Sequence, residues 1–189
     1  MNWSGRKVLV TGGASFIGSH LVDALVARGA RVRVADDLSS GRLANLDQSI
    51  GQVEFMQGDL RERSFADRAT AGMEVVFHLA ASHGGRGYID THPVECATNM
   101  VLDGTVFNSA WQAGVERIAF ASSACVYPTT LQAEQQIAQG GMVYLEEPWA
   151  DPFVPGAALA DGEYGWAKLM GEMALRAYHK QYGLKCVSC

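Results

Sequence analysis

The chain has 189 residues, of which 48% are hydrophobic and 19% charged, and its formal charge is −5 at pH 7. This length can bury one good core, so we expect residues 1–189 to form one domain with no second full domain. The acidic balance is unlike that of a nucleic-acid-binding protein, and no stretch has the roughly 20 apolar residues of a membrane helix. We therefore expect a cytoplasmic protein that binds neither nucleic acid nor a membrane.

Short apolar runs alternate along the chain with longer helical patterns, which is typical of a parallel sheet covered by helices. We expect strands at residues 7–10, 31–35, 53–56, 75–79, 118–121 and 185–187. We expect helices at residues 16–28, 94–113 and 164–182. The predicted fold class is therefore α/β, with a doubly wound parallel sheet.

Two long connections interrupt this pattern. Residues 82–92 contain three glycines and are expected to form a flexible loop, and residues 128–162 form a longer connection that contains several prolines. Long loops inside compact domains are usually functional or mobile. Both connections follow predicted strands at their carboxyl ends, where open α/β sheets bind ligands.

The first predicted strand is joined to its helix by a glycine-rich segment, residues 11–18, which reads TGGASFIG. Gly12 allows a tight turn there, and Gly18 allows helix and strand to pack closely. The backbone N–H groups near Ser15 would meet a pyrophosphate at the helix N-terminus, where the dipole favours anions. Asp36 ends the second predicted strand, and a carboxylate there binds ribose hydroxyls and repels a 2′-phosphate. This favours NAD, while Arg42 keeps NADP open as an alternative.

Tyr164 and Lys168 lie four positions apart in the last predicted helix, so their side chains project from the same face. The ammonium group lowers the cost of ionising the phenol, which makes the tyrosine usable as a base near neutral pH. The hydroxyl of Ser123, at the end of the fifth predicted strand, can bind the same substrate oxygen. These three residues suit removal of a proton from an alcohol while a hydride leaves its carbon.

The four cysteines are too few for a disulfide scaffold in a chain of this length. Cys186 and Cys189 have the spacing of a redox or zinc half-site, but they lie in a strand-like run without a second Cys or His pair nearby. We therefore expect packing there and no metal site.

Together, these motifs resemble the extended short-chain dehydrogenase/reductase family, which contains NAD-dependent nucleotide-sugar epimerases and dehydratases. The first turn resembles the family pattern TGGxGFIG and departs from it at Ser15 alone. Residues 36–41 resemble the family's ribose-binding turn, residues 58–61 its adenine-binding segment, and residues 77–81 the strand end that lines the cofactor. The resemblance covers essentially the whole chain.

The resemblance implies catalytic roles for Ser123, Tyr164 and Lys168. It also implies that Asp59 hydrogen-bonds the adenine base. The implied cofactor-binding set is Gly12, Ser15, Phe16, Ile17, Gly18, Asp36, Asp37, Leu38, Ser40, Gly41, Asp59, Leu60, Leu79, Ala80, Ala81, Tyr164 and Lys168.

Two further details narrow the choice within the family. Ala124 and Cys125 stand where the dehydratases carry an Asp-Glu pair, so dehydration lacks its acid and base. Residues 80–89 and 122–128 resemble the GDP-mannose 3,5-epimerase-like branch. That resemblance makes Cys125 a proton-transfer residue and implies substrate contacts by Gly84, Ser123, Ala124 and Cys125.

The residues themselves leave the role of Cys125 open. Ser123 and Cys125 alternate by two and would share one face of an extended segment. The alternative is a small thiol that fills a strand end. The second acid/base of the 3,5-epimerases is a lysine beyond residue 189, so epimerisation at C4 is an equal alternative.

We therefore expect an NAD-dependent epimerase that acts on a GDP- or UDP-sugar through transient oxidation to a 4-keto intermediate. The alternatives are an NAD-binding fragment or scaffold without turnover, and a net-oxidising nucleotide-sugar dehydrogenase. The family's C-terminal substrate domain is expected to be missing from residues 1–189, and a homodimer is possible.

Overall fold

The computed structural model describes residues 2–128, 148, 151–153 and 160–189. The chain divides into two compact units. The first comprises Met1–Ala81, Val101–Ala121 and Ala174–Cys189, and the second comprises Ser82–Met100 and Ser122–Met173. The expected long connection at 128–162 lies mostly outside the described residues.

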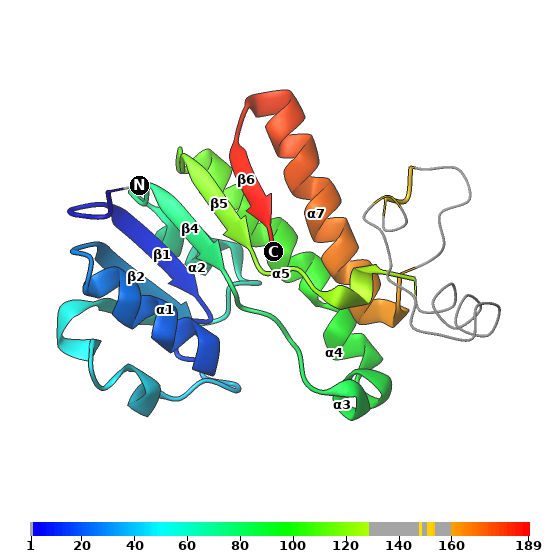
Figure 1. Cartoon of the computed structure of the whole chain (residues 1–189), viewed down its shortest axis with the longest axis horizontal. Coiled ribbons are helices and arrows are strands. Elements are labelled where there is room, and N and C mark those ends of the chain that lie inside the picture. Colours follow the sequence, from blue (N-terminus) through cyan, green and yellow to red (C-terminus); the bar gives the residue numbers. More distant parts are fainter. Residues whose placement is uncertain (1, 129–147, 149–150, 154–159) are drawn as a thin grey trace. The chain divides into compact units, whose positions relative to one another are not determined.

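A six-stranded parallel sheet lies entirely within the first unit (Figure 1). Its strand order is β3-β2-β1-β4-β5-β6, so the chain starts in the middle of the sheet and builds outward in both directions. Such a reversal of strand order is the mark of a doubly wound fold. The strands are β1 (Lys7–Thr11), β2 (Arg31–Asp36), β3 (Glu54–Gln57), β4 (Val75–His78), β5 (Arg117–Phe120) and β6 (Lys185–Ser188).

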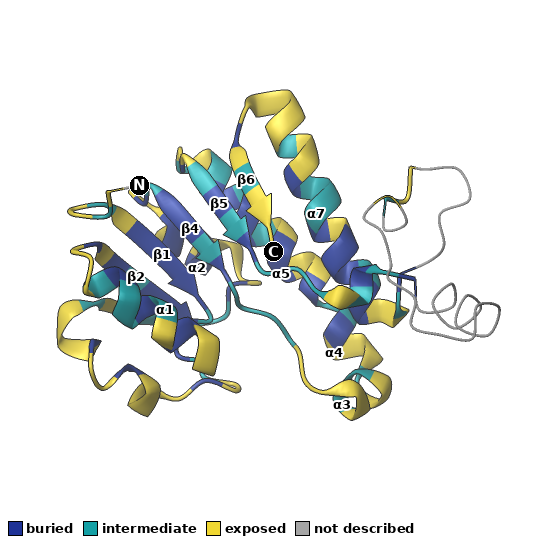
Figure 2. Ribbon diagram, in the orientation of Figure 1, coloured by how far each residue is buried: buried dark blue, intermediate teal, exposed yellow. Residues whose placement is uncertain are grey.

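Helices cover both faces of this sheet, and the central strands are accordingly buried (Figure 2). Val8 and Val10 of β1 pack with residues of α1 (Phe16–Val26) in one core cluster, whereas Leu9 between them belongs to a second cluster. The second cluster contains residues of α2 (Arg63–Thr70), α5 (Asn99–Gln112) and α7 (Gly162–Tyr182). Strands buried on both faces have continuous apolar runs, which is why the sequence alone predicts β1.

The second unit has a smaller core of Val126, Ala160 and Leu169. It contains α3 (Arg86–Thr91), α4 (Pro93–Ala97) and the 3₁₀ turn η3 (Ala124–Val126), and the first half of α7. Two further 3₁₀ turns, η1 (Leu43–Leu46) and η2 (Ile50–Gln52), precede β3 in the first unit. Within the described part of the chain, no helix is long and apolar enough to cross a membrane.

The predicted fold class is confirmed, but two predictions about helical regions were wrong and one helix was not predicted. Residues 82–92 are not all loop, because α3 occupies Arg86–Thr91, and α2 was not expected. The helix expected at 94–113 is interrupted at Thr98, whose hydroxyl donates to the carbonyl oxygen of Glu95 at 2.6 Å. Helix α2 is short and has few apolar residues, and Phe65 and Ala66 lie between polar and charged ones. Its helical pattern is therefore weak in the sequence.

Candidate functional site

Two glycines shape the turn between β1 and α1. Gly12 has a φ of +66°, a left-handed conformation that favours glycine, and a Cβ there would lie 2.8 Å from the backbone nitrogen of Ala80. A Cβ on Gly18 would overlap the carbonyl oxygen of Gly12. The turn therefore packs backbone against backbone, and the first turn of α1 approaches the end of β1 as closely as the sequence suggested.

Ser15, the departure from the family pattern, caps α1. Its φ of −75° is accessible to any residue, and its Oγ accepts from the N–H of Gly18 at 3.2 Å and donates to the carbonyl oxygen of Gly12 at 2.7 Å. The side chains of Phe16 and Ile17 are 76% and 70% exposed. Their N–H groups belong to the first turn of the helix, which has no intrahelical acceptors for them. The serine thus caps the helix and keeps the N-terminal polarity that favours an anion.

Asp36 organises the neighbouring turn after β2. Its side chain is buried, and its two oxygens accept from the N–H groups of Ala14 and Leu38, both at 2.9 Å. Leu38 has a φ of +62°, an uncommon conformation for a branched residue. A Cβ on Gly41 would lie 2.9 Å from Oδ1 of Asp36. Ser40, by contrast, is exposed.

The sequence analysis missed Ala14 and Asn45. The carbonyl oxygen of Ala14 accepts from the N–H of Arg42 at 3.0 Å and from Nδ2 of Asn45 at 2.8 Å. Together with Asp36, these bonds tie the turn after β2 to the glycine-rich turn. An asparagine in a loop carries no pattern that would have revealed this contact.

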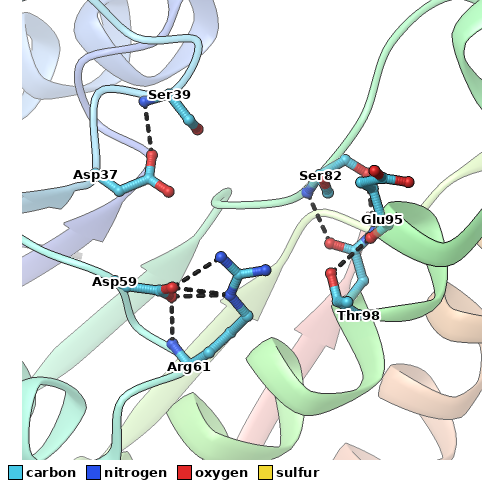
Figure 3. Close-up of polar contacts among 8 residues, drawn as sticks. Asp37, Ser39, Asp59, Arg61, Ser82, Glu95 and Thr98 are labelled. Carbon is cyan, nitrogen blue, oxygen red and sulfur yellow. Dashed lines mark hydrogen bonds and ion pairs between the residues drawn. The ribbon is translucent and has the colours of Figure 1, made fainter. Parts of the chain in front are cut away.

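Asp59 follows β3 and is engaged by Arg61. Both side-chain oxygens of Asp59 accept from the guanidinium group, at 2.7–3.0 Å, and Oδ1 also accepts from the Arg61 N–H at 2.8 Å (Figure 3). Hydrogen bonding from this guanidinium lowers the pKa of the Asp59 carboxyl group. Asp37 accepts from the N–H of Ser39 at 2.8 Å (Figure 3). Leu60, next to Asp59, is buried.

The segment after β4, Leu79 to Ala81, is attached to β1. The N–H groups of Leu79 and Ala80 each donate to Oγ1 of Thr11 at 3.1 Å. Because Ala80 also borders Gly12, this segment and the glycine-rich turn share one edge of the sheet, at the carboxyl ends of β1 and β4. Open α/β sheets bind their ligands at this edge, where the strand order reverses.

Tyr164 and Lys168 lie one turn apart at the start of α7, in the second unit. Their residues are 9% and 1% exposed, and Nζ of Lys168 lies 5.9 Å from the centre of the Tyr164 ring. The ammonium group thus lies over the aromatic ring of Tyr164.

Ser123 and Cys125 do not share the face of an extended segment, so that prediction was wrong. Ser123 is extended, but residues 124–126 turn into η3, and Oγ of Ser123 accepts from the Cys125 N–H at 3.1 Å. Ala124 is exposed between them. This local hydrogen bond, from a backbone N–H to a side chain two residues earlier, favours a turn over a strand.

The start of α7 packs directly on this turn within the second unit. The Asp161 N–H donates to the carbonyl oxygen of Cys125 at 2.9 Å, and a Cβ on Gly165 would overlap that same oxygen. Gly165 therefore permits the contact that brings the segment of Tyr164 against the segment of Cys125. The sequence placed Tyr164 and Ser123 in one site but did not reveal what joins them.

Other contacts in the second unit were not foreseen. Ser122 donates to the carboxylate of Glu172, which lies one turn beyond Lys168. Arg86 pairs with Asp161, and this contact raises the pKa of the arginine. Ser82 and the buried Asn99 exchange hydrogen bonds of 2.7 and 2.9 Å, which anchor the start of the loop that holds Gly84 (Figure 3 shows Ser82).

The described residues contain no cluster of ligands that could hold a metal ion. Cys186 packs against the larger core, its thiol lies 3.4 Å from the carbonyl oxygen of Leu175, and burial raises its pKa. Cys189 is exposed.

The residues of the first unit fit a dinucleotide. The N-terminus of the eleven-residue helix α1 offers N–H groups to a pyrophosphate, and the glycines at 12 and 18 let the backbone of the turn pack closely at this end of the helix. Each carboxylate oxygen of Asp36 can accept a further hydrogen bond, as a ribose hydroxyl would require.

Strand order and glycine-rich turn define a nucleotide-binding protein of the doubly wound class. Residues 8–189 match the model of the NAD-dependent epimerase/dehydratase family, and the chain belongs to that family. The family depends on NAD, in agreement with the predicted cofactor.

Individual relatives are similar along nearly the whole chain. GDP-mannose 3,5-epimerase 1 of Oryza sativa subsp. japonica is 32% identical over 187 residues, 97% of this chain and 46% of the relative. UDP-glucose 4-epimerase of Mycolicibacterium smegmatis is 33% identical over 183 residues, 95% of this chain and 53% of the relative. The structure of UDP-glucose 4-epimerase from Brucella ovis in complex with NAD has a TM-score of 0.74 at 26% identity, covering 97% of this chain and 51% of that chain. The chain thus spans about half the length of the relatives it matches.

Proposed function

We propose that this chain carries the NAD-binding and catalytic residues of an epimerase that inverts a nucleotide sugar through a transient 4-keto intermediate. The observation that carries the proposal is the packing of the Tyr164–Lys168 helix turn on the turn that holds Ser123 and Cys125. Family membership supports it, because the relatives include both 3,5-epimerases and 4-epimerases.

NAD is the proposed cofactor, held by the cofactor-binding residues named from the sequence. The N–H groups of Phe16 and Ile17 bind the pyrophosphate, Asp36 and the turn after β2 bind the adenosine ribose, and Leu79 to Ala81 line the cofactor. When bound, NAD supplies a reversible acceptor for hydride. Because both oxygens of Asp59 already accept from Arg61, we expect Asp59 to meet adenine through its remaining lone pairs.

Tyr164 serves as the base in this proposal. It takes the proton of the sugar 4-hydroxyl group, Lys168 stabilises the phenolate, and Ser123 holds the substrate oxygen. If bound NAD accepts the hydride and later returns it, the Tyr164 phenol would give its proton back to the same oxygen and the enzyme would end unchanged.

Cys125 is proposed to move a second proton. Oxidation at C4 acidifies the protons on the neighbouring carbons C3 and C5. The Cys125 thiolate would remove one of them and become a thiol, and an acid on the other face of that carbon would return a proton, which inverts the carbon. With Cys125 inactive in this role, the keto-sugar instead rotates and is reduced on its other face, giving epimerisation at C4. Ala124 and Gly84 complete the proposed substrate contacts.

The remaining proposals concern the whole protein. We propose a GDP- or UDP-sugar as substrate, residues 1–189 as one NAD-binding domain, and the cytoplasm as the site of action. A homodimer is consistent with the family but stays a prediction.

The test combines cofactor binding with turnover. The protein is titrated with NAD by calorimetry and then incubated with UDP- and GDP-sugars, and inversion is followed by NMR. We expect NAD binding and inversion without net accumulation of NADH. Accumulating NADH would instead indicate a net-oxidising dehydrogenase, and NAD binding without turnover of any sugar would indicate a scaffold.

A further inference from the structure

Three buried polar side chains of the first unit are joined by hydrogen bonds next to the segment Leu79 to Ala81, which is proposed to line NAD. Thr11 ends β1, His78 ends β4, and Asp103 lies on α5. Oγ1 of Thr11 lies 2.7 Å from Nδ1 of His78, and Nε2 of His78 lies 2.9 Å from Oδ1 of Asp103. The side chains of His78 and Asp103 are 0% and 2% exposed, so these bonds do not compete with bulk water.

The direction of each bond follows from the inventory of protons. The N–H groups of Leu79 and Ala80 both donate to Oγ1 of Thr11, which occupies its two lone pairs. The Leu79 N–H is shared with the carbonyl oxygen of Thr11, at 3.2 Å, so the Ala80 N–H depends more on this hydroxyl. Thr11 must then donate its only proton to Nδ1 of His78. That nitrogen is therefore unprotonated, and the imidazole carries its proton on Nε2, which donates to Asp103. One tautomer alone satisfies every partner.

Packing holds the imidazole in this orientation. The His78 ring stacks on Phe120 with centroids 5.8 Å apart and meets the edge of Phe107 at 5.5 Å. Oδ2 of Asp103 is buried without a hydrogen-bond partner among the described residues. A carboxylate this poorly satisfied costs stability, so its contribution must be sought in what it positions.

We propose that Asp103 is a positioning residue for the cofactor. By accepting the Nε2 proton of His78, it selects the tautomer that accepts from Thr11. The oriented Thr11 hydroxyl then holds Leu79 and Ala80 against the turn at Gly12. This inference rests on the proposed function, because the segment that is held is the one proposed to line NAD.

Two variants test the proposal. Asp103→Leu removes the acceptor at similar size, and Asp103→Asn keeps an acceptor oxygen without the charge. We expect Asp103→Leu to raise the Kd for NAD about fivefold to tenfold, as loss of one buried hydrogen-bonded arrangement predicts. Asp103→Asn should stay within about threefold of the wild type, because its amide oxygen can still accept from Nε2. Should Asp103→Leu fail to fold, the imidazole ¹⁵N spectrum of Asp103→Asn decides. A single Nε2–H tautomer supports the relay, by which we mean the hydrogen bonds from Thr11 through His78 to residue 103. A mixture of tautomers with normal NAD affinity overturns it.

The matched control is Thr70→Val. Thr70 is fully buried, and its hydroxyl donates to the carbonyl oxygen of Ala66 within its own helix. This variant should lower the melting temperature while leaving the Kd for NAD unchanged. If Asp103→Leu behaves in the same way, Asp103 is merely structural and the proposal is overturned.

Hydrogen exchange separates this proposal from the proposed function. Without any ligand, Asp103→Leu should speed amide exchange at Leu79 and Ala80 more than Thr70→Val does. If the wild type binds no NAD, the cofactor proposal has failed. The amide exchange rates at Leu79 and Ala80 then test the relay by themselves. Faster exchange at those two amides supports it, and unchanged exchange overturns it.

Discussion

Lys168 shows how much a single residue can depend on its surroundings. Lys168 is 1% exposed, and the cost of burying an ammonium group depends on the groups packed around it. It lies beside the Tyr164 ring, and one turn further along α7 Glu172 accepts from Ser122. The spacing of Tyr164 and Lys168 predicted their shared face, but only the folded chain shows that the pair is buried.

Lys168→Met tests the charge. We expect the epimerisation rate to fall by about 10²–10⁴-fold, because the phenol of Tyr164 loses the cation that favours its ionised form. The rate is measured by NMR in saturating substrate and NAD. Lys180→Met is the matched control, since Lys180 is exposed in the last turn of the same helix and should leave the rate unchanged. A Lys168→Met rate within threefold of the wild type would contradict the assignment.

The Asp59–Arg61 pair predicts a pH dependence of stability. In the folded protein the pKa of Asp59 lies below its ordinary value of about 4. The Asp59–Arg61 pair therefore stabilises the fold at pH values above about 4. That contribution is lost as the pH falls through the lowered pKa. The difference in unfolding free energy between wild type and Asp59→Asn should therefore shrink below about pH 4.

Urea unfolding at a series of pH values measures this difference. Arg61→Gln should remove the same pH dependence, because it removes the largest cause of the pKa shift. Persistence of the dependence in Arg61→Gln would show that another group is responsible.

Two helices of this protein pack closely against neighbouring backbone at glycine residues. Gly18 lets α1 approach the end of β1, and Gly165 lets α7 approach the turn at Cys125. The glycine-rich pattern made the first contact predictable. The second was not, since a lone glycine between Tyr164 and Trp166 has no recognisable pattern. The break of the expected helix at Thr98 is similar, because the Thr98 hydroxyl donates to the carbonyl oxygen of Glu95 there and no sequence pattern marks that bond.

Gly165→Ala tests the contact between α7 and the turn. Alanine is the better helix former, but here its Cβ would overlap a backbone carbonyl, so we expect a loss of about 1–3 kcal/mol in unfolding free energy. Gly104→Ala in α5 is the matched control, because nothing lies within 4 Å of its Cβ, and it should be neutral or stabilising by up to about 1 kcal/mol. Chemical denaturation measures both; equal effects of the two substitutions would contradict the steric explanation.

At the scale of the whole molecule, ligand binding should appear as stability. If the folded chain binds NAD and the unfolded chain does not, NAD at 100 times its Kd adds about 2.7 kcal/mol to the unfolding free energy. NADP at the same concentration should add less, because the buried carboxylate of Asp36 repels a 2′-phosphate. Thermal unfolding with each nucleotide measures this, and a larger shift with NADP would reverse the cofactor preference.

The sequence by itself determined the parallel sheet, its six strands and the residues from which the cofactor turn and the Tyr164–Lys168 pair are made. Apolar runs, helical periodicity and glycine-rich turns are local signals, so the chain displays them without folding. Only the tertiary structure decided how Asp36 clamps Ala14, how Ser123 turns back on Cys125, and how Asp103 reaches His78 across 25 residues. These contacts join residues that are distant in sequence or depend on side-chain hydrogen bonds, and no short-range pattern encodes either.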